Sequence, residues 1–283
     1  MKLSIYTCMK DAIYWDLHAV AMLKHHLPLA DEIVVNEGYS TDGTYEAIRD
    51  LHPKVKVFRS HWPKPEGLGW YNSFKDAARR QCTGDWCMLL DCDEFVPEWD
   101  FERLRSRLES ATEDLLSVDV LNFYGNYRVI HSQPKASHWP DRKMILSRNR
   151  PDVEAWGDGT NVRIADQPFA WPDIEHEFVV HHFGTVRHPA ILREKWRNQQ
   201  GRVYGTMRIP VPRFLFRWLP HRWEDPEFFN YLEAYEGPYI RAVIDDPREF
   251  VRDRFRTYDA VVKRDTKAQR LKAGPRGSPA KML

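Results

Sequence analysis

Long apolar runs are missing from this sequence. None approaches the roughly 18 consecutive apolar residues that a membrane-spanning helix needs. Net charge is almost absent as well, at +1 for 283 residues, so the overall balance does not favour a nucleic-acid partner. Residues 1–7 contain no basic stretch followed by an apolar one, so we expect no signal peptide. These absences predict a cytoplasmic protein.

Cysteine is scarce, and its spacing argues against a zinc site. The four cysteines are Cys8, Cys82, Cys87 and Cys92, and none of them forms a C-x-x-C pair. Reduced thiols are expected in a cytoplasm. Hydrophobic residues nevertheless make up 42% of the chain and aromatic residues 13%, which is enough for a large core and excludes a wholly disordered protein.

The first hundred residues alternate between strand and helix patterns. This alternation predicts right-handed crossovers and an α/β fold with a mixed, mostly parallel sheet flanked by helices. Ligands of such sheets bind beyond the carboxyl ends of the strands. The predicted strands span residues 2–8, 32–35, 55–58 and 86–90, and the predicted helices span 12–26, 41–51 and 73–81.

The pattern changes after residue 97. A charged helix is predicted at 101–108, strand material at 115–130, mixed sheet up to about 185, and helices with proline breaks at 190–260. The final stretch has seven basic residues and one acid, which is typical of a mobile tail. The predicted divisions are a catalytic domain at 1–188, a helical C-terminal extension at 189–262 and a basic tail at 263–283.

Two carboxylates follow the apolar strand predicted at 86–90. Asp91 and Asp93 alternate there, and they would point to the same side if the strand continued. Carboxylate oxygens suit hard ions such as Mg²⁺ or Mn²⁺, and a cation would offset the cost of charge beside an apolar strand. The alternative is a turn in which acidic residues cap the next helix.

A second polar segment, residues 36–44, follows the second strand and is by itself typical of a capped turn. Taken with the 91–93 motif, however, residues 34–44 resemble the nucleotide-sugar-dependent glycosyltransferases of family 2, which have the GT-A fold. Asn36 and Glu37 stand where that family usually has two aspartates, so a base-contacting role falls to Glu37.

The resemblance implies a UDP-linked or other nucleoside-diphosphate sugar as donor, transfer with inversion, and Mn²⁺ or Mg²⁺ as cofactor. Lys75 and Arg79 lie one helical turn apart and could face a diphosphate, although a solvated helix face is the alternative. Trp70 could shape a sugar pocket or simply pack. The residues assigned to the nucleotide sugar are Thr7, Met9, Glu37, Trp70, Lys75, Arg79, Asp91 and Cys92, and the assigned metal ligands are Asp91, Asp93 and His182.

A third cluster, residues 173–184, is rich in ionisable groups in a strand-like frame. His182 is the preferred metal ligand and His181 the next, the alternative being that both histidines pack and form hydrogen bonds. Inverting transfer needs a carboxylate base. Glu177 is the first choice because it lies near His182 in the sequence, and Asp158, between two glycines that also suit a hairpin turn, is the second.

The stretch 208–223 contains four arginines, four large aromatic residues and no acid. It predicts either a peripheral, cytoplasmic-side membrane contact or, more simply, a cap over the acceptor side. The acceptor could be a glycan, a lipid-linked molecule or a protein.

Two other functions compete with sugar transfer. One is a nucleotidyltransferase, which is disfavoured because residues 7–12 contain no glycine for a phosphate-binding loop. The other is a non-catalytic module that binds a nucleotide or a glycan. We expect Asp93→Ala to abolish metal-dependent transfer without disturbing the fold.

Overall fold

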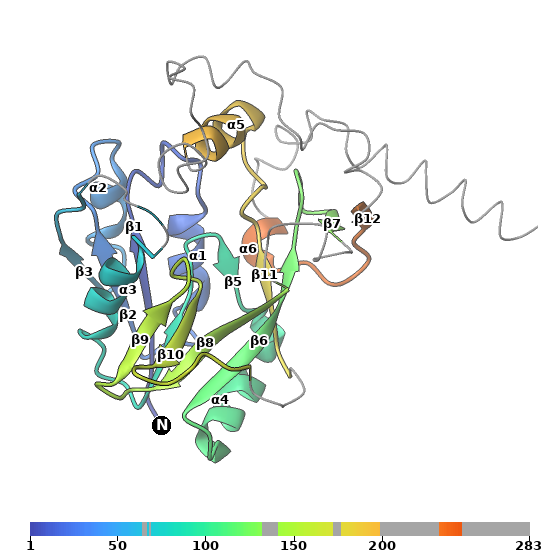
Figure 1. Cartoon of the computed structure of the whole chain (residues 1–283). Helices are drawn as coiled ribbons and strands as arrows, with labels where there is room; N and C mark the ends of the chain where they lie inside the picture. Colours follow the sequence, from blue (N-terminus) through green and yellow to red (C-terminus); the bar gives the residue numbers. More distant parts are fainter. Residues whose placement is uncertain (64–66, 68, 132–140, 172–176, 199–231, 245–283) are drawn as a thin grey trace, which may run out of the picture.

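The computed structural model describes residues 1–63, 67, 69–131, 141–171, 177–198 and 232–244 (Figure 1). The helices are α1 (Ala19–His26), α2 (Thr44–Ile48), α3 (Asn72–Arg79), α4 (Phe101–Ser110), α5 (Pro189–Asn198) and α6 (Arg241–Ile244), with a 3-10 helix, η1, at Glu98–Asp100. The strands are β1 (Leu3–Met9), β2 (Glu32–Glu37), β3 (Val55–Arg59), β4 (Trp86–Leu89), β5 (Glu94–Phe95), β6 (Leu115–Asn122), β7 (Val129–His131), β8 (Arg142–Arg148), β9 (Val153–Trp156), β10 (Asn161–Ile164), β11 (Val179–His182) and β12 (Leu232–Ala234).

Eight of the described strands form one sheet in the order β3-β2-β1-β4-β8-β6-β11-β5. The strands β3, β2, β1 and β4 run parallel to one another, and β6 runs parallel to β11. β8 runs antiparallel between β4 and β6, and β5 runs antiparallel to β11. The predicted mixed, mostly parallel sheet flanked by helices is confirmed (Figure 1).

Apolar strands and helix faces explain this arrangement. Ile33, Val34 and Val35 are almost fully buried, as expected for a parallel strand covered on both faces. Met22 of α1 and Ala78 of α3 belong to the same core. The sheet therefore has a rigid centre, and the carboxyl ends of β1, β2 and β4 lie along one edge.

The predicted helix at 12–26 begins later, at Ala19. Asp11 and Asp16 both have positive φ angles, which is rare outside glycine, and they turn the chain before α1. Their side chains accept hydrogen bonds from distant backbone: Thr41 N donates to Asp11 at 3.1 Å and His188 N to Asp16 at 2.7 Å. These contacts lie far apart in the sequence, so helical spacing could not reveal them.

The hairpin of β9 and β10 packs beside α3, where the Ala155 N–H donates to Asp76 Oδ1 at 2.7 Å. This contact brings the turn at 157–160 to the amino-terminal part of α3. One turn glycine, Gly159, has a φ of +70°, and a Cβ there would lie 3.1 Å from the Cβ of Tyr71, so glycine suits this close approach.

In the predicted helical extension, α5 and α6 are present, but residues 232–234 form a strand, β12, antiparallel to β7. β12 extends the β structure by pairing, which helical periodicity cannot anticipate. The stretch 208–223 and the tail 263–283 lie outside the described residues, and the boundaries at 188 and 262 stay predictions.

Within the described residues, no helix combines the length and apolarity needed to span a membrane.

Candidate active site

The acidic motif lies where β4 ends. The chain turns at once, with Glu94 N donating to the Asp91 carbonyl at 3.0 Å and Asp91 N donating to Glu94 Oε2 at 3.0 Å. The strand geometry therefore does not continue through Asp91 and Asp93, and the two carboxylates have different partners. Both remain buried or half-buried at the carboxyl edge of the sheet.

Asp91 is held by two buried lysines. Lys75 Nζ of α3 lies 2.5 Å from Asp91 Oδ1, and Lys143 Nζ of β8 lies 3.5 Å from Oδ2. Burial alone would raise the pKa of Asp91, but these two ammonium groups outweigh it and hold the pKa well below its usual range. Lys143 also pairs with Glu94, whose pKa is raised by burial.

Asp93 faces a different set of groups. Arg187 Nη2 donates to Asp93 Oδ2 at 2.7 Å, and His182 Nε2 lies 3.7 Å from Oδ1. Burial would raise the pKa of this carboxyl, but His182, Lys195 and Arg187 together lower it to about 2. Asp93 is therefore ionised at neutral pH although only 5% of it is exposed.

His182 is oriented by a neighbour on β6. Its Nδ1 lies 2.7 Å from Asn122 Oδ1, a carbonyl oxygen that can only accept, so Nδ1 carries the proton. Burial lowers the pKa of His182 to about 4, which keeps the ring neutral. The unprotonated Nε2 lies 3.7 Å from Asp93 Oδ1. A carboxylate beside an imidazole that is anchored through its other nitrogen is a pair that could hold a divalent ion.

The described residues contain no group of three or more His, Cys, Asp or Glu side chains arranged to hold a metal. A hard divalent ion held by Asp93 and His182 would keep positions for phosphate oxygens and water. Lys195 of α5 lies close enough to influence this site, and burial lowers its pKa to about 8. The carboxylates are Asp91, Asp93 and Glu94, and the cationic side chains are Lys75, Lys143, Arg187 and Lys195.

Four cationic side chains thus meet three carboxylates around the acidic motif, an arrangement that favours an anion such as a diphosphate. A family model described as Glycosyl transferase family 2 matches residues 17–163, just over half of the chain. This chain belongs to glycosyl transferase family 2. The predicted resemblance is confirmed, and the protein is a glycosyltransferase.

Two solved structures are similar to this family 2 transferase at low identity. A crystal structure of S. aureus TarS residues 1–349 is 11% identical, with 80% of this chain and 73% of that chain covered and a TM-score of 0.38. Glucosyl-3-phosphoglycerate synthase from Mycobacterium tuberculosis, in complex with Mg²⁺ and uridine diphosphate, is 17% identical, with 43% of each chain covered and a TM-score of 0.31. No curated protein sequence matches.

The transferase uses Lys75 and Arg79 differently, although they lie one turn apart on α3. Lys75 Nζ reaches both Asp91 and, at 2.6 Å, the Gly159 carbonyl. Arg79 Nη1 instead donates to the Arg150 carbonyl at 2.9 Å. Only Lys75 therefore joins the acidic motif.

Glu37 is fully buried and engaged within the protein. Its carboxylate accepts hydrogen bonds from Ser40 N at 2.6 Å and Tyr39 N at 3.1 Å, and Arg59 Nε donates to it at 2.6 Å. Glu37 thus holds the loop after β2 in shape, and its contact with the nucleotide stays a prediction.

The other residues assigned to the nucleotide sugar are largely covered. Thr7 and Met9 are buried in β1, Met9 at the carboxyl end. Cys92 is buried between the two aspartates of the motif. Trp70 packs in an aromatic cluster with Trp62, Tyr71 and Phe74.

The two carboxylates considered as base lie far apart in the fold. Glu177 is exposed before β11, where its carboxylate pairs with Arg107 Nε of α4 at 3.0 Å. It precedes His182 by five residues of extended chain, so the structure does not bring it to the acidic motif. Asp158 lies in the β9–β10 turn next to Gly159, whose carbonyl contacts Lys75.

Sequence reasoning missed several members of the site. Lys143 lies in a run of buried residues in β8. A lysine in an otherwise apolar strand indicates a paired, buried charge, so the sequence alone could have pointed to it. Arg187 and Asn122 carry no such signal, because only the pairing of β6 with β11 brings them to His182 and Asp93. His181 is buried against Phe123 and Tyr235 rather than facing Asp93.

Proposed function

We propose that this chain transfers the sugar of a nucleoside diphosphate donor, UDP-linked in the first instance, to an acceptor hydroxyl with inversion. The observation that carries the proposal is the pair formed by Asp93 Oδ1 and His182 Nε2, 3.7 Å apart and flanked by Arg187. A carboxylate and a neutral imidazole suit Mn²⁺ or Mg²⁺. When bound, the ion would supply positive charge for the diphosphate.

The cationic side chains give the chain its own means of stabilising the leaving group. Lys75 and Lys143 are both buried, and both are already fixed by contacts to Asp91. Fixed positive charge in a desolvated site stabilises developing negative charge without reorganisation. We therefore assign these two lysines, with Arg187, to neutralising the departing nucleoside diphosphate.

The base has two candidates, and placement favours Asp158. Its turn is joined to the acidic motif through Lys75, whereas Glu177 is paired with Arg107 at the start of β11. In the proposed reaction, Asp158 removes the proton of the acceptor hydroxyl while that oxygen attacks the anomeric carbon and the bond to the diphosphate breaks.

The proposal is tested by measuring nucleotide release from a panel of UDP-, GDP-, CMP- and dTDP-sugars, with Mn²⁺ and with EDTA. Binding of UDP with Mn²⁺ should also raise the melting temperature. Asp93→Asn should abolish metal-dependent release, and Asp50→Asn, an exposed aspartate paired with Arg49, serves as the matched control. Wild-type turnover by Asp93→Asn in excess Mn²⁺ would refute the metal assignment.

The partners follow from this reaction: a nucleotide-sugar donor and a glycan, lipid-linked or protein acceptor, without nucleic acid. The peripheral membrane contact through 208–223 and the cytoplasmic location stay predictions. Liposome co-sedimentation of the chain with and without 208–223 tests the contact, and equal sedimentation of the two would remove it.

A further inference from the structure

Three aromatic rings contact one another on the surface beside the β9–β10 hairpin. The rings of Trp156 and Phe169 are nearly parallel, with centroids 6.4 Å apart, and Phe169 meets Trp171 edge-on at 5.1 Å. Trp156 is 37% exposed and Trp171 42% exposed. Two indoles joined in one exposed patch are typical of a binding surface rather than of a core.

Each tryptophan is accompanied by an arginine. The guanidinium carbon of Arg163 lies 3.6 Å from the centroid of the Trp156 ring, and that of Arg142 lies 5.4 Å from the Trp171 centroid. Such contacts hold the rings in place. We call these five residues, Trp156, Phe169, Trp171, Arg142 and Arg163, the aromatic–arginine surface.

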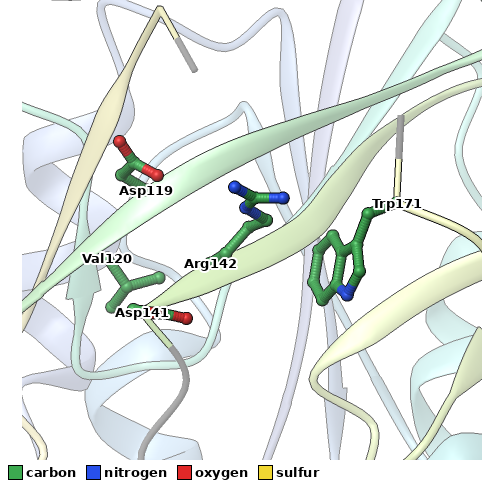
Figure 2. A pocket seen from close by; sticks show the side chains of 5 residues that line it. All are labelled: Asp119, Val120, Asp141, Arg142 and Trp171. Atoms are coloured by element: carbon green, nitrogen blue, oxygen red, sulfur yellow. The ribbon is translucent and has the colours of Figure 1, made fainter. Parts of the chain in front are cut away.

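A hollow of about 420 Å³ opens beside this surface. Figure 2 shows Arg142 between Asp119 and Trp171, with Asp141 at the lower edge of the hollow. Among the described residues, its lining combines an indole, a guanidinium group, two carboxylates and Val120. A concave space with an aromatic wall and a few polar groups is the usual form of a small-molecule subsite.

The surface adjoins the acidic motif along two elements. On β8, Arg142 precedes Lys143, and alternate residues of a strand point to opposite faces, so Lys143 reaches Asp91 while Arg142 reaches Trp171. On the hairpin, Trp156 directly precedes the 157–160 turn that contacts Lys75. Arg142 and the hollow thus lie on the face of β8 opposite Lys143, and the surface adjoins the site where transfer is proposed through its Trp156 end, beside the turn that contacts Lys75.

The charges of the region narrow the class of ligand. Arg142 and Arg163 are matched by Asp119 and Asp141, and Arg163 is paired with Glu154 at 2.7 Å. Polyanions and anionic membranes bind to surfaces with a net positive charge, whereas the residues described here carry three carboxylates, Asp119, Asp141 and Glu154, against two guanidinium groups. Aromatic faces with both hydrogen-bond donors and acceptors at the rim suit a neutral, polyhydroxylated chain.

We infer that the aromatic–arginine surface and its hollow bind the acceptor as a chain of neutral sugar units. This inference rests on the proposed glycosyltransferase function and names its acceptor class. The C–H faces of the sugar rings lie on Trp171 and on the face of Trp156 that does not carry Arg163. Their hydroxyls donate to Asp119 and Asp141 and accept from Arg142, so the growing end is directed toward the 157–160 turn.

The test is direct binding of neutral hexasaccharides to the full chain, measured by calorimetry with maltohexaose, cellohexaose and chitohexaose. At least one should bind, and Trp156→Ala and Trp171→Ala should each weaken it about tenfold or more. Trp171→Phe, which keeps an aromatic face, should recover part of the affinity. Trp99→Ala is the matched control, because Trp99 is 45% exposed but lies on η1, outside the surface; it should bind as the wild type does.

Melting curves show whether each variant is folded. Failure of all three hexasaccharides to bind, equal binding by the tryptophan variants and the wild type, or tighter Trp171-dependent binding to anionic phosphatidylglycerol vesicles would overturn the inference. Nucleotide release measured in parallel separates the two proposals. If the wild type releases nucleotide in a metal-dependent way but binds no hexasaccharide, the acceptor class is wrong and the transferase proposal stands.

Discussion

Asp93 Oδ2 accepts a hydrogen bond of 2.7 Å from Arg187 Nη2, a residue 94 positions later in the chain. Arg187 is almost fully buried, and its Nη1 donates to the Trp15 carbonyl at 3.0 Å. The carboxylate assigned to the metal is therefore also half of a buried ion pair that joins the segment after β11 to the turn after β4. One residue serves both the chemistry and the fold.

The first prediction concerns this ion pair. Removing one partner leaves a buried charge without compensation, so Arg187→Met and Asp93→Ala should each lower the free energy of unfolding by about 3–5 kcal/mol. Urea denaturation measures this change. This expected loss of stability replaces the sequence-based expectation that Asp93→Ala leaves the fold intact. Asp93→Asn keeps the size and polarity of the side chain, so it should lower the stability less. A loss below about 1 kcal/mol in Arg187→Met would show that the pair is not structural.

The second prediction concerns Asn122. Because it accepts the Nδ1 proton of His182, Asn122→Ala should weaken the apparent Mn²⁺ affinity by about 10- to 100-fold, as loss of such supporting hydrogen bonds typically does. The measurement is a Mn²⁺ titration of UDP binding. Asn122→Asp, which retains an acceptor at this position, should recover much of the affinity. Unchanged Mn²⁺ dependence in Asn122→Ala would contradict the assignment of His182.

The third prediction compares two cations of α3. Lys75→Met removes a charge at Asp91, so we expect UDP affinity to fall by about tenfold or more, the order of one hydrogen bond to a charged group. Arg79→Met is the matched control, because Arg79 donates to the Arg150 carbonyl instead. It should lower stability and leave UDP affinity nearly unchanged. Equal losses of affinity in the two variants, measured by calorimetry, would rule out a specific role for Lys75.

The fourth prediction concerns acid stability. His26 is buried with Nδ1 2.8 Å from the Met22 carbonyl, and it accepts a hydrogen bond from Val96 N at Nε2, an arrangement that only a neutral ring can make. Burial, with some help from His25, lowers the pKa of His26 well below its ordinary value of 6.5. The unfolded chain therefore binds more protons once the pH falls below about 6.5, and the free energy of unfolding should decline from there toward the folded-state pKa.

Denaturation at pH 7.5 and pH 5 measures this decline. His26→Gln should be less stable at pH 7.5 but lose less stability on acidification, whereas His52→Gln should behave like the wild type because His52 is exposed. Equal acid sensitivity of His26→Gln and the wild type would assign the proton uptake to other groups. His181, whose pKa is lowered to about 4 by burial, contributes in the same direction.

Local sequence patterns were enough to predict the parallel part of the fold. A strand such as β2 is apolar because both of its faces are covered, and that requirement is met within a few neighbouring residues. The position of Asp91 and Asp93 after a buried strand was visible for the same reason. The sequence offered the turn that separates their side chains only as an alternative, because that turn depends on the Glu94 side chain accepting a hydrogen bond from Asp91 N.

The amino-acid sequence by itself thus determined the strands, the helices around them and the edge of the sheet at which the acidic motif lies. Tertiary structure alone decided which groups surround that motif. Lys143 reaches Asp91 because β8 is inserted antiparallel beside β4, and Arg187 reaches Asp93 because the chain returns along β11. Such pairings join residues 52 and 94 positions apart, and hydrophobic periodicity, which reports only on near neighbours, contains no information about them.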